Sequence, residues 1–214
     1  MENLNKYIDH TLLKPEACEA DIKKLCKEAK EHHFKAVCVH PHWVKKAVEL
    51  LSGSDVAVCT VVGFPLGTTL SSVKAFETRM CVDAGATEID MVIDLSSAKA
   101  GQWDLVTKDI ASVVEAASGR LVKVIIESCL LTDDEIRRAC RAALEAKAQF
   151  VKTSTGFSTG GASLHAVKLM KETVGDELFV KASGGIRDRE TALSMIEAGA
   201  SRIGTSSGIS IVTS

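Results

Sequence analysis

Short apolar runs rich in β-branched residues recur along the chain, and longer stretches with apolar residues three and four positions apart lie between them. The runs are typical of buried strands, and the spacing of three and four is typical of amphipathic helices. The predicted strands are residues 7–11, 34–40, 56–64, 88–94, 121–128, 150–156, 179–185 and 202–205. The predicted helices are residues 18–33, 70–84, 103–117, 132–146, 164–173 and 189–198.

Strands and helices that alternate along a chain indicate a parallel sheet. Two architectures compete, a closed barrel and an open doubly wound sheet. Eight predicted strands favour closure, and no G-x-G-x-x-G pattern follows the first strand, which counts against a dinucleotide-binding sheet. The prediction is therefore an α/β fold, a single-domain (β/α)8 TIM barrel that spans residues 1–214.

The amino-acid composition and net charge limit the kinds of binding partner that we expect. The chain is 46% hydrophobic and 25% charged, with a net charge of -2. This balance gives no indication of binding to nucleic acid or to an anionic membrane surface. No apolar run approaches the ~20 residues of a spanning helix, and the first six residues contain no apolar signal core. We expect a cytoplasmic protein that binds neither nucleic acid nor membrane.

Seven cysteines are present, an odd number, and none forms a C-x-x-C pair. Neither a disulfide framework nor a zinc ribbon is indicated. His40 and His42 are one candidate pair of metal ligands, but no cysteine or acidic cluster adjoins them. We interpret them as loop residues beside the end of a strand, and we expect no metal site.

The sixth and seventh predicted strands carry the same motif, F-V-K-x-S-x-G, which places Lys152 and Lys181 at matched positions among apolar residues. Neighbouring strands in register would bring these lysines about 5 Å apart in backbone spacing. Burial and mutual repulsion both disfavour the charged form, so at least one pKa is expected to fall below its usual value of about 10.4. A neutral amine suits a Schiff-base nucleophile. The alternative is that a lysine pairs with a carboxylate in the core.

Carboxylates are available near the lysines. The strand at residues 88–94 has acids at alternate positions, which predicts that Glu88, Asp90 and Asp94 share one face. Asp90 lies between Ile89 and Met91 and is hard to explain as a surface residue. It is a candidate proton shuttle or lysine partner.

Glycines cluster after the sixth, seventh and eighth strands. Gly156, the pair Gly184 and Gly185, and the segment GTSSG at 204–208 mark these three loops. Glycine allows backbone N–H groups to approach an anion, and barrels often hold phosphate in the last of these loops. Ser206 and Ser207 could begin a short helix over residues 208–212, whose first N–H groups favour negative charge.

Several segments together resemble the deoxyribose-phosphate aldolase family. They are IDHTLLKP at 8–15, GFPLG at 63–67, EIDMV at 88–92, VKTSTG at 151–156, VKASGGIR at 180–187 and GTSSG at 204–208. The resemblance covers essentially the whole chain in order. It implies a class I aldolase that reversibly cleaves 2-deoxy-D-ribose 5-phosphate to acetaldehyde and D-glyceraldehyde 3-phosphate, with no metal and no other cofactor.

The resemblance also implies roles for individual residues. Lys152 forms the Schiff base, Lys181 lowers the Lys152 pKa and assists proton transfer, and Asp90 donates and accepts protons. The positions that match the phosphate side are Gly156, Gly184, Gly185, Ser206 and Ser207. The positions that match the lining of the pocket are Asp9, Thr11 and Cys38.

Three positions depart from the pattern. Phe157 stands where some longer members carry a second lysine on the phosphate side, and Asp94 and His40 stand where asparagine is expected. These departures leave the lysine chemistry intact and bear on substrate preference.

Two other functions fit the same predicted barrel. One is a phosphate-sugar isomerase with Asp90 as the base, which leaves the paired lysines unexplained. The other is a non-catalytic module that binds phosphosugars. We also expect a homo-oligomer, either a dimer or a tetramer.

Overall fold

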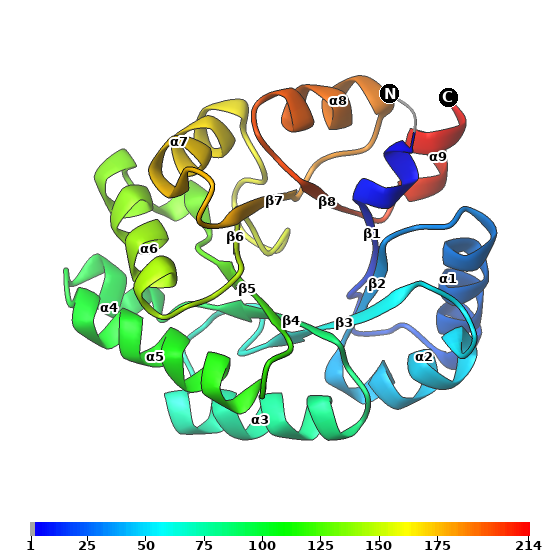
Figure 1. The fold of residues 1–214 in the computed structure, drawn as a ribbon, viewed down its shortest axis with the longest axis horizontal. Helices are drawn as coiled ribbons and strands as arrows, with labels where there is room; N and C mark the ends of the chain where they lie inside the picture. The colour runs from blue at the N-terminus through cyan, green and yellow to red at the C-terminus, as the bar shows by residue number, and fades with distance from the viewer. Residues whose placement is uncertain (1–2) are drawn as a thin grey trace.

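Eight parallel strands pair in chain order, and the last pairs with the first, so the sheet closes into a barrel (Figure 1). The computed structural model describes residues 3–214. The predicted (β/α)8 barrel is confirmed, and the open sheet is excluded. The strands are β1 (Ile8–Leu12), β2 (Ala36–Val39), β3 (Ala57–Val62), β4 (Glu88–Val92), β5 (Leu121–Ile125), β6 (Phe150–Lys152), β7 (Phe179–Ser183) and β8 (Arg202–Thr205).

Helices surround the barrel in a single ring (Figure 1). The α-helices are α1 (Glu19–Glu31), α2 (Val44–Leu51), α3 (Ser71–Asp83), α4 (Leu95–Lys99), α5 (Trp103–Ala116), α6 (Asp133–Glu145), α7 (Leu164–Val174), α8 (Arg189–Glu197) and α9 (Gly208–Thr213). Three short 3-10 segments are η1 (Leu4–Tyr7), η2 (Pro41–Trp43) and η3 (Ser128–Leu130). Within residues 3–214, no helix combines the length and the apolar character needed to cross a bilayer.

The structure differs from the sequence-based prediction in two ways: two helices were not predicted, and one acidic residue lies elsewhere than expected. Helix α2 was not predicted, although Val44, Ala47 and Leu51 follow the helical spacing and are buried. Helix α4 has five residues, too few to show a period. The placement of Asp94 on the strand face was wrong, because β4 ends at Val92 and Asp94 accepts hydrogen bonds from the first N–H groups of α4.

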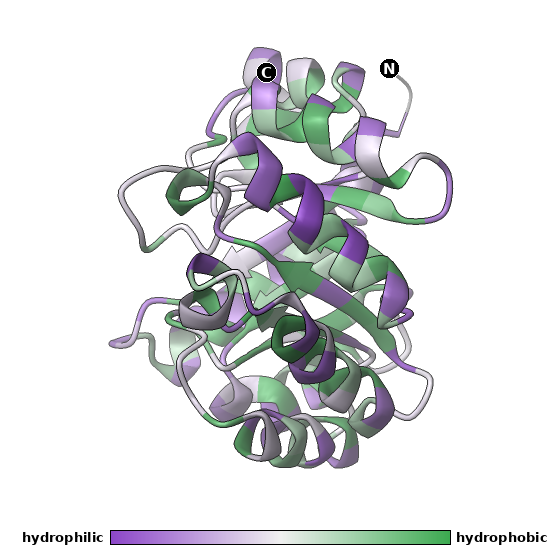
Figure 2. Cartoon of the chain, turned by 90° about the vertical axis from the view of Figure 1, so that its left-hand side faces the viewer, coloured by the Kyte–Doolittle hydropathy of each residue, from purple (hydrophilic) through white to green (hydrophobic). Residues whose placement is uncertain are grey.

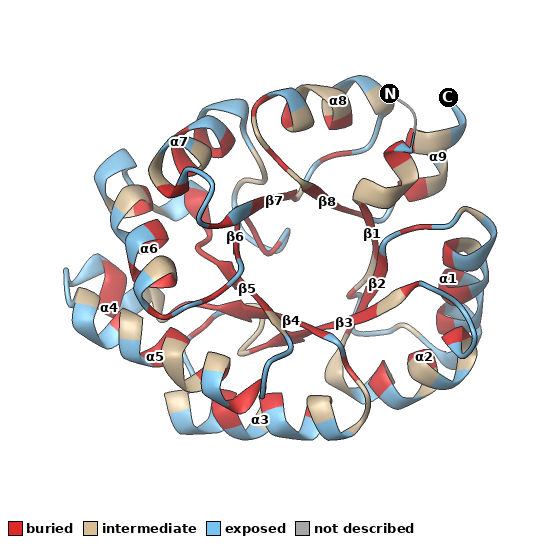
Figure 3. Cartoon of the chain, viewed as in Figure 1, coloured by how far each residue is buried: buried red, intermediate tan, exposed pale blue. Residues whose placement is uncertain are grey.

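The apolar core has two parts. The larger part lies between the strands and the surrounding helices, where one face of most helices is buried (Figure 3) and hydrophilic and hydrophobic residues alternate along the helices (Figure 2). The smaller part lies inside the barrel and consists of Leu13, Ala36, Cys38, Cys59 and Val61. Because these residues come from the β1 to β3 side, apolar packing fills only part of the barrel interior.

A buried ion pair fastens α3 to the rest of the ring. Lys74 of α3 is fully buried, and its Nζ donates to Oδ2 of Asp109 on α5 at 2.6 Å and to the carbonyl of Val92 at 2.8 Å. Asp109 also accepts from the Ser71 hydroxyl at 2.7 Å. Losing one partner of such a pair leaves a buried charge without compensation, which costs roughly 3–5 kcal/mol.

We predict that Lys74→Met lowers the free energy of unfolding by about 3 kcal/mol, because Asp109 loses its ammonium partner. Denaturant unfolding measures the change. Lys45→Met, at an exposed lysine, is the control and should change stability by less than about 0.5 kcal/mol. Equal changes in the two variants would show that the pair does not hold α3 in place.

Candidate active site

The lysines of the repeated motif lie side by side inside the barrel. Lys152 on β6 and Lys181 on β7 are register partners, which confirms that the matched positions are neighbours. Both side chains are buried, with Lys152 3% exposed and Lys181 fully covered. The side chains of β4, β5 and β8 that point inward meet them there.

Asp90 lies at the centre of this group and bridges three lysines. Its Oδ2 accepts from Nζ of Lys152 and from Nζ of Lys181, both at 2.8 Å. Its Oδ1 accepts from Nζ of Lys123 at 2.8 Å. The sequence reasoning missed Lys123, which stands in the apolar run of β5 but is fully buried in the barrel interior.

A second set of charges lies directly around the first. Glu88 binds Nζ of Lys123 at 2.6 Å and the Arg202 guanidinium at 2.8 Å. Asp9 accepts from Nε of Arg202 at 2.7 Å and contacts Nζ of Lys181 at 2.5 Å. Arg202 and Glu88 had no predicted role, and here they join the two carboxylates Asp9 and Asp90 into one network.

The network carries one surplus positive charge when every group is ionised. It contains four cations and three carboxylates: Lys123, Lys152, Lys181 and Arg202, with Asp9, Glu88 and Asp90. Buried charge without compensation is costly, so a neutral lysine relieves the imbalance. Among the lysines, Lys152 contacts a single carboxylate, whereas Lys181 contacts two and Lys123 contacts three.

The pKa shifts follow from this arrangement. Burial alone would lower the pKa of Lys181, but the carboxylates of Asp9 and Asp90 raise it above its ordinary value. Burial would raise the pKa of Asp90, yet the three ammonium groups hold it well below the usual range. Asp9 behaves in the same way, because Lys181 and Arg202 outweigh burial and bring its pKa to about 2. The lowered pKa that was expected for at least one of the two lysines is therefore not found at Lys181.

A cavity of about 310 Å³ opens above Lys152 at the carboxyl ends of the strands. Of the predicted site residues, those that line it are Thr11, Lys152, Gly156, Gly184, Gly185 and Ser206. Asp9, Cys38, Asp90 and Lys181 are fully buried and are not part of this lining. Ser207 lines an adjoining hollow beside α1 and α9 together with Ser206.

Two cations at the cavity were not singled out from the sequence. Lys14 follows β1 and Arg187 follows the Gly184–Gly185 turn, and both line the cavity. Each is exposed, so its charge faces solvent where an anion would enter. Phe157 also lines the cavity and packs its ring against Phe64, with centroids 5.3 Å apart. A basic residue two positions after a glycine pair was the available signal for Arg187.

Two glycines are required by close approaches at the site. A Cβ on Gly204 would lie 2.8 Å from Cβ of Ser183 and 3.1 Å from Cε of Lys181. A Cβ on Gly161 would lie 2.2 Å from the carbonyl oxygen of Gly184. Gly204 thus leaves room for the Lys181 side chain, and Gly161 lets the loop after β6 pack on the loop after β7.

Glu127 anchors the loop that follows Lys152. It is 2% exposed and has a φ of 50°, in the left-handed region that few residues other than glycine adopt. Its carboxylate accepts from the N–H of Thr155 at 3.2 Å and from the Thr155 hydroxyl. Because Thr155 lines the cavity, this contact fixes one wall of the site.

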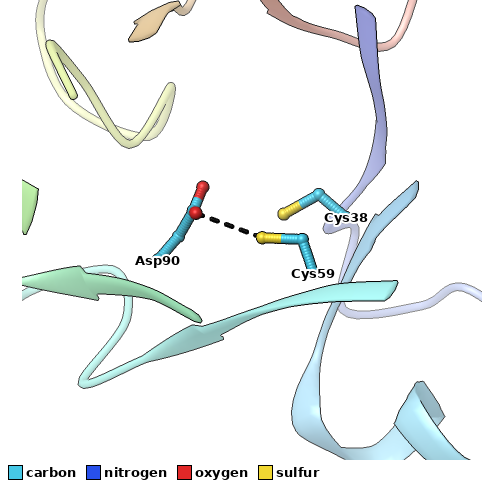
Figure 4. A group of neighbouring side chains, drawn as sticks. All are labelled: Cys38, Cys59 and Asp90. Carbon is cyan, nitrogen blue, oxygen red and sulfur yellow. Dashed lines mark hydrogen bonds between the residues drawn. The ribbon is translucent and has the colours of Figure 1, made fainter. Parts of the chain in front are cut away.

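Cys38, Cys59 and Asp90 form a group whose side chains point toward one another (Figure 4), with candidate ligand atoms within 4.8 Å. The Cys59 thiol donates to Oδ1 of Asp90 at 3.1 Å. A thiol and carboxylate set suits a soft divalent cation by donor type. Both oxygens of Asp90 are already bound by ammonium groups, however, so a cation here would meet strong repulsion from Lys123 and Lys152.

A closed (β/α)8 barrel with paired lysines around a buried aspartate, below a cavity lined by glycine loops, is the architecture of a barrel enzyme with its candidate site at the carboxyl ends of the strands. Comparison with known proteins agrees with this class. Residues 4–213 match the family model described as DeoC/LacD family aldolase, and the chain belongs to that family.

Individual relatives cover nearly the whole chain. The chain is 61% identical over 211 residues to a deoxyribose-phosphate aldolase of Brevibacillus brevis, a match that covers 99% of this chain and 96% of the relative. It is 59% identical to the deoxyribose-phosphate aldolase of Streptococcus sanguinis, covering 98% and 95%. The structure of a tetrameric deoxyribose phosphate aldolase from Aeropyrum pernix is 36% identical, with a TM-score of 0.91, covering 97% and 88%.

We predict that the stabilising contribution of Asp9 is lost in acid. Its pKa is about 2 in the folded chain and near 3.8 ordinarily, so folding favours the ionised form. The contribution is therefore complete above about pH 5 and disappears as the pH falls through about 2. Asp9→Asn should lower the free energy of unfolding by about 3 kcal/mol at pH 7, and the gap to wild type should shrink between about pH 4 and 2.

Urea unfolding across this pH range measures that gap. Asp104→Asn, at an exposed carboxylate on α5, is the control and should change stability by less than about 0.5 kcal/mol at every pH. A gap that stays constant down to pH 2 would mean that Asp9 does not stabilise the fold through its charge.

Proposed function

We propose that this chain is a class I aldolase that reversibly cleaves 2-deoxy-D-ribose 5-phosphate to acetaldehyde and D-glyceraldehyde 3-phosphate through a Schiff base on Lys152. The observation that carries the proposal is the position of Lys152. It is the one lysine of the charge network that also lines the cavity, and its Nζ contacts a single carboxylate. The named activity of relatives about 60% identical over nearly the full chain supports the substrate.

The proposed cleavage begins with a neutral Lys152. Its amine attacks the aldehyde carbon of the open-chain sugar, and loss of water gives an iminium ion. A base then removes the proton from the C3 hydroxyl, the C2–C3 bond breaks, and glyceraldehyde 3-phosphate leaves. The electron pair from that bond forms an enamine on Lys152, which gains a proton at carbon and is hydrolysed to acetaldehyde and the free amine.

Lys181 and Asp90 have complementary roles in this proposal. Lys181 stays an ammonium, because its raised pKa reflects two carboxylate partners. That fixed cation lies directly beside Lys152, its neighbour in register. Asp90 contacts both amines, and in this proposal it accepts and returns the protons that leave and reach the amine of Lys152. General acid–base groups of this kind typically contribute ~10²–10⁴-fold to rate.

The phosphate is proposed to bind at the glycine and serine loops, among Gly156, Gly184, Gly185, Ser206 and Ser207. Lys14 and Arg187 line the same cavity and supply positive charge. Because Phe157 stands where some longer family members have a lysine near the phosphate, Lys14 and Arg187 are the proposed source of positive charge for the phosphate. Charge-assisted hydrogen bonds contribute roughly 1.5–3 kcal/mol each.

Other properties are proposed on the same basis. We infer a single aldolase domain over residues 1–214 that acts in the cytoplasm on a small phosphosugar, without a cofactor or metal and without nucleic acid. A homo-oligomer is proposed because the Aeropyrum pernix relative is described as tetrameric.

We predict that borohydride reduction in the presence of acetaldehyde leaves an ethyl group on Lys152. An aldolase that uses an imine gains this adduct, whereas an isomerase or a simple binding module does not. Lys152→Ala should abolish the adduct and lower kcat for cleavage by at least about 1000-fold, which corresponds to ~4 kcal/mol of barrier. Peptide mass mapping and a coupled cleavage assay measure both effects.

Lys168→Ala, at an exposed lysine on α7, is the matched control and should keep both the adduct and the turnover. An adduct on a lysine other than Lys152, or cleavage that survives Lys152→Ala, would refute the assignment.

We predict that Arg187→Met and Lys14→Met each raise KM for deoxyribose 5-phosphate by roughly 10-fold, in line with the loss of one charge-assisted contact at an exposed position. KM for unphosphorylated deoxyribose should stay within about twofold. Lys24→Met is the control, because Lys24 lines the adjoining hollow and not the cavity. An effect confined to Lys24→Met would move the phosphate to that hollow, and equal losses on both sugars would argue against a phosphate role.

A further inference from the structure

His10 is a buried titratable side chain that takes no part in the proposed chemistry. It follows Asp9 on β1, and because side chains alternate along a strand, its ring points away from the charge network inside the barrel. The residue is 3% exposed. Its Nε2 lies 2.8 Å from Oε2 of Glu28 on α1, and its ring packs against Phe34 with centroids 5.0 Å apart. His10 is thus held from the side of α1.

The imidazole also sets the position of the first residue of α9. A Cβ added to Gly208 would lie 2.9 Å from Nδ1 of His10 and 3.0 Å from Cζ of Phe34. Both distances are shorter than the usual contacts of a Cβ atom. The backbone of Gly208 therefore rests directly on the ring of His10, and a glycine at this position is what allows the approach.

The other end of the loop before α9 depends on the same residue. His10 and Thr205, the last residue of β8, are register partners. The Thr205 hydroxyl accepts from the N–H of Ser207 at 2.9 Å. Ser206 and Ser207 therefore run between two points, Thr205 and Gly208, that are both fixed by residue 10. The backbone of His10 fixes the first point, and its ring fixes the second.

The ring presents a hydrogen-bond acceptor to the start of α9. A carboxylate only accepts hydrogen bonds, so in the neutral ring Nε2 carries the proton and donates to Glu28, which leaves Nδ1 as an acceptor. Burial lowers the pKa of His10, although the Glu28 carboxylate opposes this, so the neutral ring is favoured at neutral pH. Nδ1 is buried and makes no hydrogen bond with residues 3–214. A buried acceptor without a partner reduces stability, so its place beside this loop requires another explanation.

We propose that His10 is a positioning residue for substrate phosphate: its imidazole, held by Glu28, keeps the Ser206–Ser207 loop where the phosphate binds. The inference rests on the proposed phosphate site. Ser206 lines both the cavity and the adjoining hollow, whereas His10 lines the hollow alone. The ring therefore supports the loop from outside the cavity and does not touch the substrate.

The test compares steady-state kinetics on deoxyribose 5-phosphate and on unphosphorylated deoxyribose. His10→Leu keeps an apolar side chain in the buried space but loses the hydrogen bond to Glu28 and the flat ring under Gly208. We expect KM for the phosphorylated sugar to rise about 10-fold, while kcat and the KM for deoxyribose stay within about threefold of wild type. A general loss of folding would instead lower kcat on both sugars.

Two further variants separate the hydrogen bond from the mere size of the side chain. His10→Gln retains an N–H donor for Glu28, so it should bring KM for the phosphorylated sugar back to within about threefold of wild type. Glu28→Leu removes the same contact from the α1 side and should raise that KM as His10→Leu does. Because both substitutions break one contact, the double variant should be little worse than either single variant.

His165→Leu is the matched control. Nε2 of His165 on α7 lies 2.8 Å from Oδ1 of Asp133 on α6, the same distance as in the His10–Glu28 pair, but both partners are exposed. The control should keep both KM values.

Two measurements without turnover distinguish this inference from the proposed function. The Kd for inorganic phosphate, measured by isothermal titration calorimetry, should rise about 10-fold in His10→Leu and stay unchanged in His165→Leu. Acetaldehyde carries no phosphate, so borohydride should trap it on Lys152 equally well in wild type and in His10→Leu. Wild type that is not trapped, with the phosphate result as expected, would count against the aldolase and support the role of His10. An unchanged Kd for phosphate in His10→Leu, equal losses on the two sugars, or no recovery in His10→Gln would overturn the inference.

Discussion

The surplus positive charge inside the barrel is the constraint on which the rest of the site depends. Three lysines share the single carboxylate of Asp90, and Arg202 adds a fourth cation. Asp9 and Glu88 bring the carboxylates to three, so one positive charge is left over when every group is ionised. Water cannot compensate these charges, since all of them are buried. Closing the sheet into a barrel brings the carboxylates of β1 and β4 to the cations of β5 to β8. An open sheet would leave β1 and β8 apart and the network incomplete.

Placing this network inside the barrel moves most apolar packing to the outside. Barrel interiors are usually filled by branched apolar side chains. Here such packing is confined to a small cluster on the β1 to β3 side, and the larger core lies between strands and helices. The same preference for buried ion pairs recurs at Lys74 and Asp109, where it orients α3. Polar contacts therefore set the orientation of elements, while apolar burial supplies most of the favourable free energy.

The sequence was sufficient for the fold and for the central residues of the site, because each had a local signal. Eight apolar runs predicted eight strands, and the repeated motif predicted that Lys152 and Lys181 are neighbours. Lys123 and Arg202 had no such signal, since one stands in an apolar run and the other at the start of a strand. Which way they point, and which acids they meet across the barrel, depends on closure and register. Asp94 was misplaced because strand ends are set by backbone pairing and not by alternation.

The raised pKa of Lys181 corrects the simplest argument about paired lysines. Repulsion between two buried ammonium groups predicts that one of them becomes neutral, but it does not say which. Asp9 and Asp90 both hold Lys181 in its charged form, whereas Lys152 contacts only Asp90, through the oxygen that also binds Lys181. The lysine with the fewest carboxylate partners is also the one that lines the cavity. The proposed chemistry therefore uses as its nucleophile the amine that has the fewest carboxylate contacts and direct access to the cavity.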